Sequence, residues 1–583
     1  MLFLGELWIS LRKTLYIIMD RITKSYLDKF SNSNGFEDCD DISTIFEHFV
    51  NYTVVEPKSE YRFDIENVNI GFNGTIGIDG FALLLNGQII ESQDELIEFL
   101  DDHKKCSADI IFTQAKTSKS FSRTDIRGFG DAVSDFIAEE QILSWSDLAK
   151  EKIALFNALI SRAAELVSNP SCYLYYATTG KDEQDVNIEA AKQLVEADIV
   201  NENIFSSIVI ALLGANELQT AYKKIGQAIT RTFDFSKRVS LPEIDNVKEA
   251  YIGVVKAQSI VDLMTDENGL LISNVFYDNV RDYQGENKVN AEISKTIQSD
   301  NKDSFSVLNN GITIVAENLV PARDNFTISN YQIINGCQTS HVLFTNKDHL
   351  NDSVQVPMKL IISDNDELTS NVIRSTNRQT EVKEQDLIAF SDFQKRLEDY
   401  YGTFKGEDRL YYERRSKQYN RGSVERKRII DKTQQIKAIA SLYYNKPELA
   451  TRYFGTVFSE LGDKLFKDNH DMRPYYTASY TLFKIDQLFR SKQIAKKYRK
   501  IKFHMLTMLR HEINNSKCPP FEAHRKCNNY CDAILEIFKS PTKLSPLITS
   551  VMNKIDSLNY DLDDLEISKS KDFVDKCLSF YKP

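Results

Sequence analysis

The sequence predicts an α/β protein made of three successive regions. Helical patterns alternate with short apolar strand patterns over residues 41–245, and the same alternation resumes over residues 246–390. After about residue 391 the alternation of β-branched residues stops and long helical patterns replace it. We therefore expect an N-terminal α/β domain with a mixed sheet, a central α/β domain, and a mainly helical C-terminal region over residues 391–583.

Length, charge and cysteine content fit this division. A chain of 583 residues is long enough for several hydrophobic cores. The formal net charge of -12 excludes a protein coated in basic residues, so nucleic acid would have to meet a local positive patch. The 8 cysteines are scattered without a paired framework, which indicates a reducing cytoplasm.

Residues 1–40 are expected to form an N-terminal extension and a lead-in helix. The opening "MLFLGELWISLRKTLYIIMD" is apolar, but Glu6, Arg12 and Lys13 interrupt it, so crossing a bilayer would be costly. It also lacks the positive start and the small-residue cleavage site of a signal peptide. The sequence leaves open whether translation starts at Met1 or at Met19. We expect no association with membranes.

The N-terminal domain, 41–245, begins with a helix and a hairpin. In "DISTIFEHFVN" the apolar residues recur at helical spacing, and Glu47 lies on their flank. The next segment, "EYRFDIENVNIGF", has the alternation of a strand. In "GTIGIDGFALLLNGQIIES", Asn86 and Gly87 separate two apolar runs, which predicts a type I′ hairpin.

Helices and strands alternate through the rest of this domain. "SQDELIEFLDDHKK" predicts a helix and "ADIIFTQAK" the next strand. A long amphipathic helix over "WSDLAKEKIALFNALISRAAELV" precedes the strand "CYLYYATTG", which Gly180 closes. This order indicates a mixed sheet with flanking helices.

Polar side chains stand where two of the expected strands end. Asp79 ends "GTIGID", and Gln114 and Lys116 stand two residues apart at the end of "ADIIFTQAK", so they share one face of that strand. A carboxylate at the same rim would make an oxygen site suited to Mg²⁺ or Mn²⁺. Lys116 would then orient or deprotonate a water, or stabilise charge on a phosphate.

The same spacing has a plainer interpretation. Gln114 and Lys116 also fit the solvated face of an edge strand, which commonly carries polar and charged side chains. One Asp and a Gln-x-Lys are too small a pattern to decide between the two.

The stretch "GIDGFALLLNG" followed by "DIIFTQAKTSKSF" resembles the restriction-endonuclease-like nucleases of the PD-(D/E)xK type, in the variant where Gln replaces the second acid. The resemblance implies that fold over residues 41–245 and a divalent metal, Mg or Mn, as cofactor. The residues it maps to catalysis are Asp79, Gln114, Lys116 and Glu47, of which Asp79, Gln114 and Glu47 would hold the metal. Because the Gln114 amide is neutral, Glu47 would have to supply the missing negative charge.

Five phrases further along resemble the AIPR proteins, the abortive infection phage resistance family. In chain order they are "NVRDYQGENKVNAEI", "LNNGITIVAENL", "QIINGCQTS", "STNRQTEVKEQDL" and "YYERR". Together with the nuclease-like stretch, the resemblance covers roughly residues 40–450. It implies a role in bacterial defence against phage, but not what the central domain, 246–390, does.

The central domain is expected to hold a polar cleft. Asn335-Gly336 predicts a tight turn that feeds a helix N-terminus, which suits a phosphate. Cys337 and His341, four residues apart, offer a thiol–imidazole pair instead, and ordinary turn and cap chemistry is the plainest interpretation. The residues expected to line the cleft are Asn309, Asn310, Asn335, Gln338, Thr339 and Asn377.

Three cysteines and one histidine in the C-terminal region are four candidate zinc ligands. They are Cys518, His524, Cys527 and Cys531. The spacing lacks a C-x₂-C knuckle, and Cys527 and Cys531 fall on the apolar side of one helical pattern. We therefore expect buried thiols and no zinc.

Residues 409–428 form the most basic stretch, with eight Lys or Arg, two Glu and three Tyr. Such a mixture suits a surface that follows a nucleic-acid backbone while bases stack on the rings. A solvated helix or loop face is the alternative. The residues expected to contact nucleic acid are Arg414, Arg415, Lys417, Arg421, Arg426, Lys427 and Arg428.

These patterns and resemblances predict a metal-dependent nuclease that favours DNA over RNA and acts as an effector in anti-phage defence, in response to a phage-derived or host trigger. The alternative is a catalytically inactive nucleic-acid-binding or phage-sensing protein that uses the nuclease fold as a scaffold. A homo-oligomer is left open.

Overall fold

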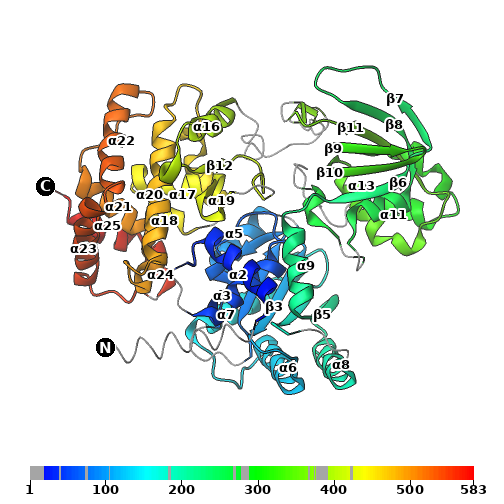
Figure 1. Cartoon of the computed structure of the whole chain (residues 1–583), viewed down its shortest axis with the longest axis horizontal. Helices are drawn as coiled ribbons and strands as arrows, with labels where there is room; N and C mark the ends of the chain where they lie inside the picture. Colours follow the sequence, from blue (N-terminus) through cyan, green and yellow to red (C-terminus); the bar gives the residue numbers. More distant parts are fainter. Residues whose placement is uncertain are drawn as a thin grey trace. The chain divides into compact units, whose positions relative to one another are not determined.

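The computed structural model describes residues 19–37, 41–71, 77–103, 105–180, 185–266, 269, 271–276, 288–365, 368–369, 371–372, 375, 392–420, 424–452, 454–562 and 564–582. The predicted N-terminal extension up to residue 18 lies outside these ranges. The chain is a mixed α/β protein with sheets of five, six and two strands, followed by a mainly helical region, which confirms the predicted fold class (Figure 1). No helix among the described residues is long and apolar enough to cross a membrane.

The chain divides into two compact units. One comprises Met1–Lys24, Phe46–Leu96 and His103–Leu387, and so contains both larger sheets. The other comprises Ser25–Ile45, Ile97–Asp102 and Ile388–Pro583. Its main segment begins within a few residues of the boundary predicted at 391, but two earlier segments of the chain also belong to it.

The first sheet has the strand order β2-β1-β3-β4-β5. Its strands are β1 (Gly80–Leu85), β2 (Gln88–Ile90), β3 (Ala108–Lys116), β4 (Ser171–Thr178) and β5 (Ser207–Leu213). Strand β1 is antiparallel to β2 and β3, whereas β3, β4 and β5 run parallel to one another. Asn86 and Gly87 join β1 to β2 with φ of 46 and 75, as the type I′ turn requires, so the predicted hairpin is confirmed.

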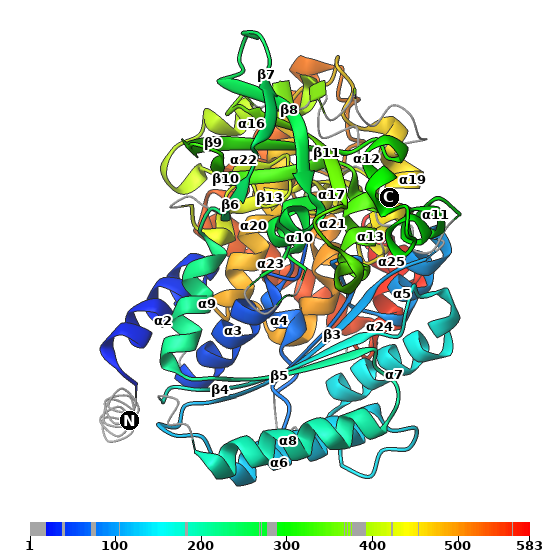
Figure 2. The same cartoon turned by 90° about the vertical axis from the view of Figure 1, so that its right-hand side faces the viewer.

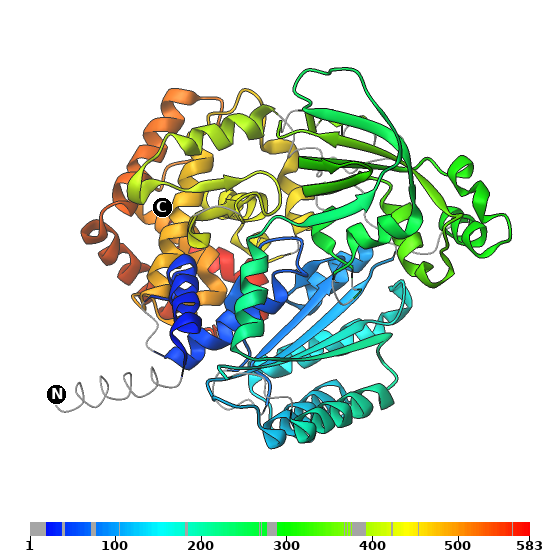
Figure 3. The same ribbon diagram turned by 45° about the vertical axis from the view of Figure 1, so that its right-hand side comes forward.

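Helices cover both faces of the first sheet. They are α3 (Ile42–Val55), α5 (Gln93–Asp102), α6 (Arg123–Ile137), α7 (Asp147–Ser161), α8 (Val186–Asn201) and α9 (Ala215–Ile225), and α2 (Arg21–Asn34) precedes them. Helices α6 and α8 lie side by side on one face, with α3 and α9 on the other (Figure 2 and Figure 3). On the α6 face, Phe112 packs against Phe136 with ring centroids 5.2 Å apart.

The segment "EYRFDIENVNIGF" is not a strand, contrary to the prediction. It holds the short helix α4 (Ile65–Val68), because Asp64 caps it by accepting a 3.2 Å hydrogen bond from the Glu66 N–H. Only Asn69 forms an isolated bridge, with Gly80. The residues after α4 therefore run beside the start of β1.

The second sheet has the order β6-β10-β9-β11-β8-β7. Its strands are β6 (Thr230–Asp234), β7 (Lys237–Ser240), β8 (Glu249–Lys256), β9 (Ile312–Ala322), β10 (Asn325–Asn335) and β11 (Gln355–Ile362). Strands β9 and β11 are parallel and the other pairs antiparallel. Since β6 and β7 belong to it, the second sheet begins before the predicted boundary at 245, because these short, mostly polar strands give no apolar signal.

Helices of the central region pack on the second sheet. They are α10 (Ala257–Met264), α11 (Lys288–Gln298), α12 (Phe305–Leu308) and α13 (Cys337–Thr345). One apolar core joins residues of these helices, such as Ile260 of α10, to alternate residues of the strands, such as Ile314 and Leu360. Two of the five phrases that resemble AIPR proteins lie largely outside the described residues, since 277–287 and 376–391 are not described.

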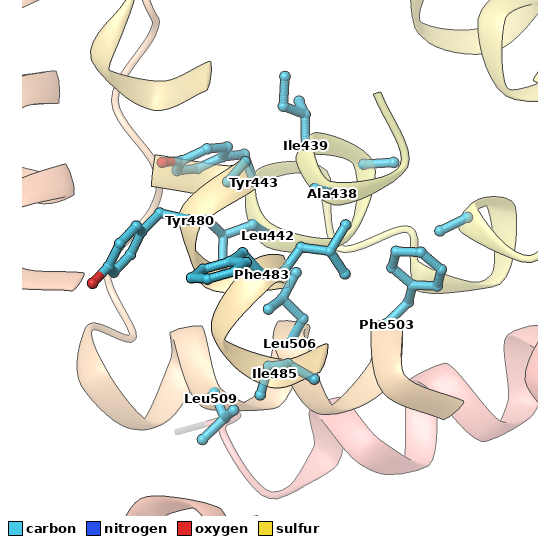
Figure 4. Packing of buried hydrophobic residues seen from close by; sticks show 14 of the residues in the cluster. Ala438, Ile439, Leu442, Tyr443, Tyr480, Phe483, Ile485, Phe503, Leu506 and Leu509 are labelled. Carbon is cyan, nitrogen blue, oxygen red and sulfur yellow. The ribbon is translucent and has the colours of Figure 1, made fainter. Parts of the chain in front are cut away.

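The described residues of the C-terminal region are mainly helical, with the two short strands β12 (Tyr411–Glu413) and β13 (Ile429–Asp431). Its helices are α16 (Asp392–Gly402), α17 (Lys432–Tyr444), α18 (Pro447–Ala450), α19 (Phe454–Leu461), α20 (Arg473–Arg490), α21 (Lys502–Ile513), α22 (His524–Phe538), α23 (Pro541–Ser557), α24 (Leu565–Lys569) and α25 (Lys571–Ser579). Leu442, Phe483 and Leu506 from three of these helices meet in one core (Figure 4).

Candidate functional site

Asp79 lies directly before β1 and is anchored to the end of β3. Its N–H donates a 2.8 Å hydrogen bond to the Thr113 carbonyl, and its Oδ2 accepts a 2.8 Å hydrogen bond from the Ala115 N–H. The side chain is only 9% exposed. Two bonds to β3 thus hold this carboxylate beside the end of that strand.

Gln114 and Lys116 stand on one face of β3, at its end. Phe112, two residues earlier, packs on α6, so the alternation of the strand turns Gln114 and Lys116 toward the same side of the sheet. Gln114 is 4% exposed, and its Oε1 has no hydrogen-bond partner among the described residues. Lys116 is half-buried. Since a buried polar atom normally has a partner, the Gln114 oxygen calls for one that the described residues do not supply.

Glu47 approaches Asp79 from α3, which lies on the face of the sheet opposite to α6 (Figure 2). Its Oε2 accepts a 3.1 Å hydrogen bond from the Asn69 amide, in the segment that runs beside β1. A Cβ at Gly71 would lie 3.0 Å from Asp79 Oδ1 and 3.3 Å from Glu47 Oε2. The two carboxylates therefore face one small space, which Gly71 leaves unfilled because it has no side chain.

Burial dominates the electrostatics of Asp79. Desolvation raises the pKa of its carboxyl above 3.8, while the hydrogen bond from Ala115 and the positive charge of Lys116 act in the opposite direction. Tyr176 of β4 is the cross-strand neighbour of Gln114. Burial raises the pKa of its hydroxyl, and the charges of Asp125 and Asp79 raise it further. These groups therefore share one electrostatic environment.

We predict that Asp79→Asn stabilises the metal-free protein near neutral pH. The folded pKa of Asp79 lies above the unfolded value, so the stability that protonation provides is present at low pH and is lost as the pH rises through the folded pKa. Asn carries no charge and still offers an oxygen to Ala115. Thermal unfolding in EDTA should show a gain of about 2–4 °C, the equivalent of about 1 kcal/mol in a domain of this size.

The gain should shrink as the pH falls toward the ordinary aspartate value of 3.8. The exposed Asp131→Asn variant on α6 is the control and should show no such pH dependence, because its i,i+4 pair with Arg127 is a surface one. A loss of stability in Asp79→Asn at neutral pH would contradict the assignment of burial as the dominant effect.

The residues at this rim fit a divalent metal. Two carboxylates and an amide oxygen without a partner are hard oxygen donors, as Mg²⁺ and Mn²⁺ prefer. Within the described ranges, no three His, Cys, Asp or Glu side chains lie close enough to hold an ion, so a site here would need the Gln114 amide as its third protein ligand.

Sequence reasoning missed four residues of this rim: Asn69, Gly71, Asp125 and Tyr176. Asp125 lies in the first turn of α6, whose cap Ser122 accepts a hydrogen bond from the Asp125 N–H. The Ser-x-x-Asp of "SRTD" is the signal that could have placed it, since it marks a helix start directly after the Lys116 loop. The other three depend on contacts across the fold.

The basic segment 409–428 differs from both of its predicted descriptions. Arg414 is buried and its Nε donates to Glu398 Oε2 at 3.2 Å, and Lys417 is buried as well. Arg428 pairs with Glu425 at 2.9 Å, and Lys427 pairs with Glu37. Arg414 and Lys417 thus belong neither to an open nucleic-acid surface nor to a solvated face.

The prediction that these side chains are exposed to nucleic acid is wrong for Arg414 and Lys417, which are buried. Arg414 is buried, and the Glu398 carboxylate on α16 pairs with its positive charge. Arg415 and Arg426 are half-buried, and Arg421 lies outside the described residues. Binding of nucleic acid by this segment stays a prediction.

Two turns of the predicted polar cleft lie against each other. A Cβ at Gly336, which has φ of 95, would come within 3.0 Å of the Gly311 carbonyl oxygen. This brings Asn310, before Gly311, and Asn335, before Gly336, to one end of the second sheet. Asn309 instead shows cap chemistry, because its amide donates a 3.0 Å hydrogen bond to the Phe305 carbonyl.

Gln338 and Thr339 lie in the first turn of α13, and Gln338 Oε1 accepts a 2.9 Å hydrogen bond from Asn290. His341 is one turn further along, and burial lowers its pKa to about 4. Asn377 lies outside the described residues.

Cys527 and Cys531 of the predicted cluster are buried as predicted, whereas Cys518 is half-buried. Cys527 and Cys531 of α22 lie in the apolar core, and the Tyr443 hydroxyl is 3.4 Å from Cys531 Sγ. His524 is exposed and bonds to Asp471 at 3.0 Å. Packing in the core accounts for the two buried thiols.

Comparison with known proteins identifies one part of the chain. Residues 276–563 match the model of a family described as AIPR protein. This part of the chain is similar to the AIPR family. The AIPR match includes β9, β10, β11 and the helical region up to α23, and supports the family resemblance drawn from the five phrases. It does not include the first sheet, and neither a curated protein nor a solved structure matches the chain.

Proposed function

We propose that this protein is a metal-dependent nuclease, with DNA as the favoured substrate, and that it is an effector of anti-phage defence. The observation that carries the proposal is the Gln114 Oε1, which is buried at the strand end where Asp79 is anchored and has no partner within the described part of the chain. A metal ion bound also by the Asp79 carboxylate is the partner that we propose for this oxygen. The arrangement of β1, β2, β3 and β4 around this rim agrees with the restriction-endonuclease-like resemblance.

Asp79, Glu47 and Gln114 would hold the ion. When bound, a divalent cation polarises a phosphoryl oxygen and makes a nearby water more acidic. The hydrogen bonds from Ala115 to Asp79 and from Asn69 to Glu47 fix the two carboxylates before substrate arrives, so little reorganisation is needed.

Lys116 has a separate role in the proposed reaction. Lys116 lies two residues after Gln114, on the same face of β3. The positive charge of its ammonium group lowers the pKa of Asp79, so Lys116 and Asp79 interact. A cation there would position the attacking water and stabilise the negative charge that develops on the phosphate. Neither task requires Lys116 to bind the metal.

The AIPR match supports a defence role, since the family is named for abortive infection and phage resistance. The match lies over the second sheet and the helical region, whereas the proposed active site lies in the first sheet. We infer a division of labour in which the AIPR part receives a phage-derived or host trigger and the first sheet cleaves nucleic acid.

An inactive scaffold that binds nucleic acid or senses phage is the second candidate. It is favoured by the small number of acidic ligands, since the described residues hold no set of three metal-ligating acids, histidines or cysteines. In that case the rim would retain the fold of a nuclease without the charge needed to hold a cation.

Incubation of the purified protein with labelled DNA and RNA, in Mg²⁺, Mn²⁺ or EDTA, tests the proposal. We expect cleavage of DNA with either metal and none in EDTA, and Asp79→Ala should remove it in both metals. Asp131→Ala on α6 is the matched control, because Asp131 is an exposed acid that pairs only with a surface arginine. Cleavage that persists in EDTA, or that Asp79→Ala leaves intact, would exclude the metal mechanism.

A further inference from the structure

The loop of residues 117–122, between β3 and α6, is fixed to the end of β4. Lys116, the last residue of β3, has Thr178 of β4 as its cross-strand partner. Directly beyond this pair, the Thr179 N–H and Oγ1 both donate to the Ser118 carbonyl, at 3.1 and 2.8 Å. The loop therefore begins beside the proposed active site and is held against the end of β4.

Three further contacts fix the rest of the loop. A Cβ at Gly180 would lie 2.0 Å from the Lys119 carbonyl oxygen, so the loop passes the end of β4 at a distance that only glycine permits. The Phe121 ring packs on Tyr176 of β4, with ring centroids 6.1 Å apart. Ser122 ends the loop as the N-cap of α6, and its side chain accepts from the first turn of that helix. The backbone therefore has a defined position, from which the exposed side chains project.

The two exposed cations of this segment have no ion-pair partner. Lys119 lies in the loop and Arg123 is the first residue of α6. Neither side chain forms a hydrogen bond or an ion pair with any of the described residues. The basic segment 409–428 differs, because carboxylates pair with Arg414 and Lys427 there. In a chain with a formal net charge of -12, two cations without an acidic partner create a local positive potential at this rim.

Arg123 also occupies a position that does not favour a cation. The N-terminus of a helix carries a partial positive charge, so an arginine there lowers the stability of the helix. Ser122 caps α6 without any contribution from the arginine, and the fold gains nothing from this positive charge. Local sequence rules are commonly broken where function requires it. A ligand of opposite charge therefore explains Arg123 better than the stability of α6 does.

We infer that Lys119 and Arg123 bind the phosphodiester backbone of the strand that the proposed active site cleaves, an inference that rests on the proposed function. In that reaction Lys116 acts on the scissile phosphate, and the two exposed cations contact neighbouring phosphates. The exposed side chains of the loop, Lys119 and Ser120, are a cation and a hydroxyl, and contacts of either kind with phosphate carry no information about the bases. The substrate class is therefore a nucleic-acid strand of any sequence.

Binding of labelled DNA to the full-length protein in EDTA tests this inference in the absence of cleavage. Anisotropy titrations from about 50 to about 200 mM NaCl give the slope of log Kd against log salt, whose magnitude falls by about 1 for each phosphate contact that is lost. We expect Lys119→Ala and Arg123→Ala each to lower it by about 1, and the double variant by about 2. The change should be the same on oligo(dA), on oligo(dT) and on DNA of mixed sequence.

Lys295→Ala, on α11, is the matched control, because it removes an exposed lysine that likewise has no partner in the described part of the chain. Its slope should equal that of the unaltered protein. Arg123→Ala should unfold at or above the temperature of the unaltered protein, since it removes a cation from a helix N-terminus. Weaker binding by this variant is then not a consequence of unfolding.

The outcomes for binding and for cleavage are separate. A slope that neither Lys119→Ala nor Arg123→Ala changes would overturn the inference even if the protein cleaves DNA. A change confined to one DNA sequence would overturn it as well, because backbone contacts do not distinguish bases. The expected loss of slope in a protein that cleaves nothing in Mg²⁺ or Mn²⁺ would support backbone binding and contradict only the proposed reaction.

Discussion

Lys116→Ala is expected to lower metal-dependent DNA cleavage by about a thousandfold while the protein remains folded and still binds Mn²⁺. Removal of a single group that stabilises transition-state charge costs about 10²–10³ in rate, and Lys116 would in addition position the water. Its side chain is half-buried at a strand end, so we expect its truncation to leave the sheet intact. Initial rates on labelled DNA, with thermal shifts in Mn²⁺ beside them, measure both parts of the prediction.

Lys116→Arg tests whether the position of the Lys116 nitrogen matters or only its positive charge, and Lys150→Ala is the control. Lys116→Arg keeps the positive charge that lowers the pKa of Asp79, yet it displaces the nitrogen, so metal binding should persist while most of the activity is lost. Lys150→Ala removes an exposed lysine of α7 that pairs with Asp147 at 3.3 Å and should be fully active. Full activity in purified Lys116→Ala would refute the mechanism, and the scaffold alternative would then be favoured.

The proposed rim is the part of the site that local sequence patterns predict well. Strand β3 coincides with "ADIIFTQAK", and the Asn86-Gly87 turn fixes β1 next to it, because such a turn sets the register of the strands it joins. Once β1 and β3 are neighbours, Asp79 and Gln114 must meet at one edge. Period and turn chemistry are local properties, so a single sequence is enough to read them.

Other parts of the site depend on contacts that sequence spacing does not encode. Whether Arg414 is a free cation or a buried one is decided by Glu398, which lies on another element and accepts from it at 3.2 Å. In the same way, the space between Glu47 and Asp79 exists because Gly71 passes between them, and "EYRFDIENVNIGF" gives no sign of this. The alternation in that segment predicted a strand, but the Asp64 cap favours a helical turn.

Substitution of Gln114 should change stability and metal binding in opposite directions, more clearly than any other substitution at this site. Its amide is buried with an oxygen for which the described residues offer no partner, so Gln114→Leu removes a polar group that they leave unsatisfied. We expect the metal-free protein to gain about 1 kcal/mol and to lose the thermal shift with Mn²⁺ and all cleavage. Hydrogen exchange of the β3 amides, with thermal unfolding, measures the gain in this unit.

Gln435 provides the matched control, because it is a buried glutamine whose amide is fully engaged. Its Oε1 accepts from Tyr401 at 2.6 Å and from Ser479 at 3.1 Å, and its Nε2 donates to the Tyr475 carbonyl at 2.9 Å. Gln435→Leu removes these three buried hydrogen bonds and should cost about 2–3 kcal/mol. Opposite signs for the two substitutions would show that the Gln114 amide serves a ligand and not the fold.

Gln114→Glu asks whether a neutral amide limits the site. A third carboxylate beside Asp79 and Glu47 should destabilise the metal-free protein, because burial already raises the pKa of Asp79 and a like charge raises it further. Added negative charge should at the same time strengthen Mn²⁺ binding by about tenfold or more, measured by calorimetry. Unchanged metal affinity in Gln114→Glu, together with an intact Mn²⁺ shift in Gln114→Leu, would show that the amide oxygen is not a ligand, and the metal-dependent mechanism would then lose the observation on which it rests.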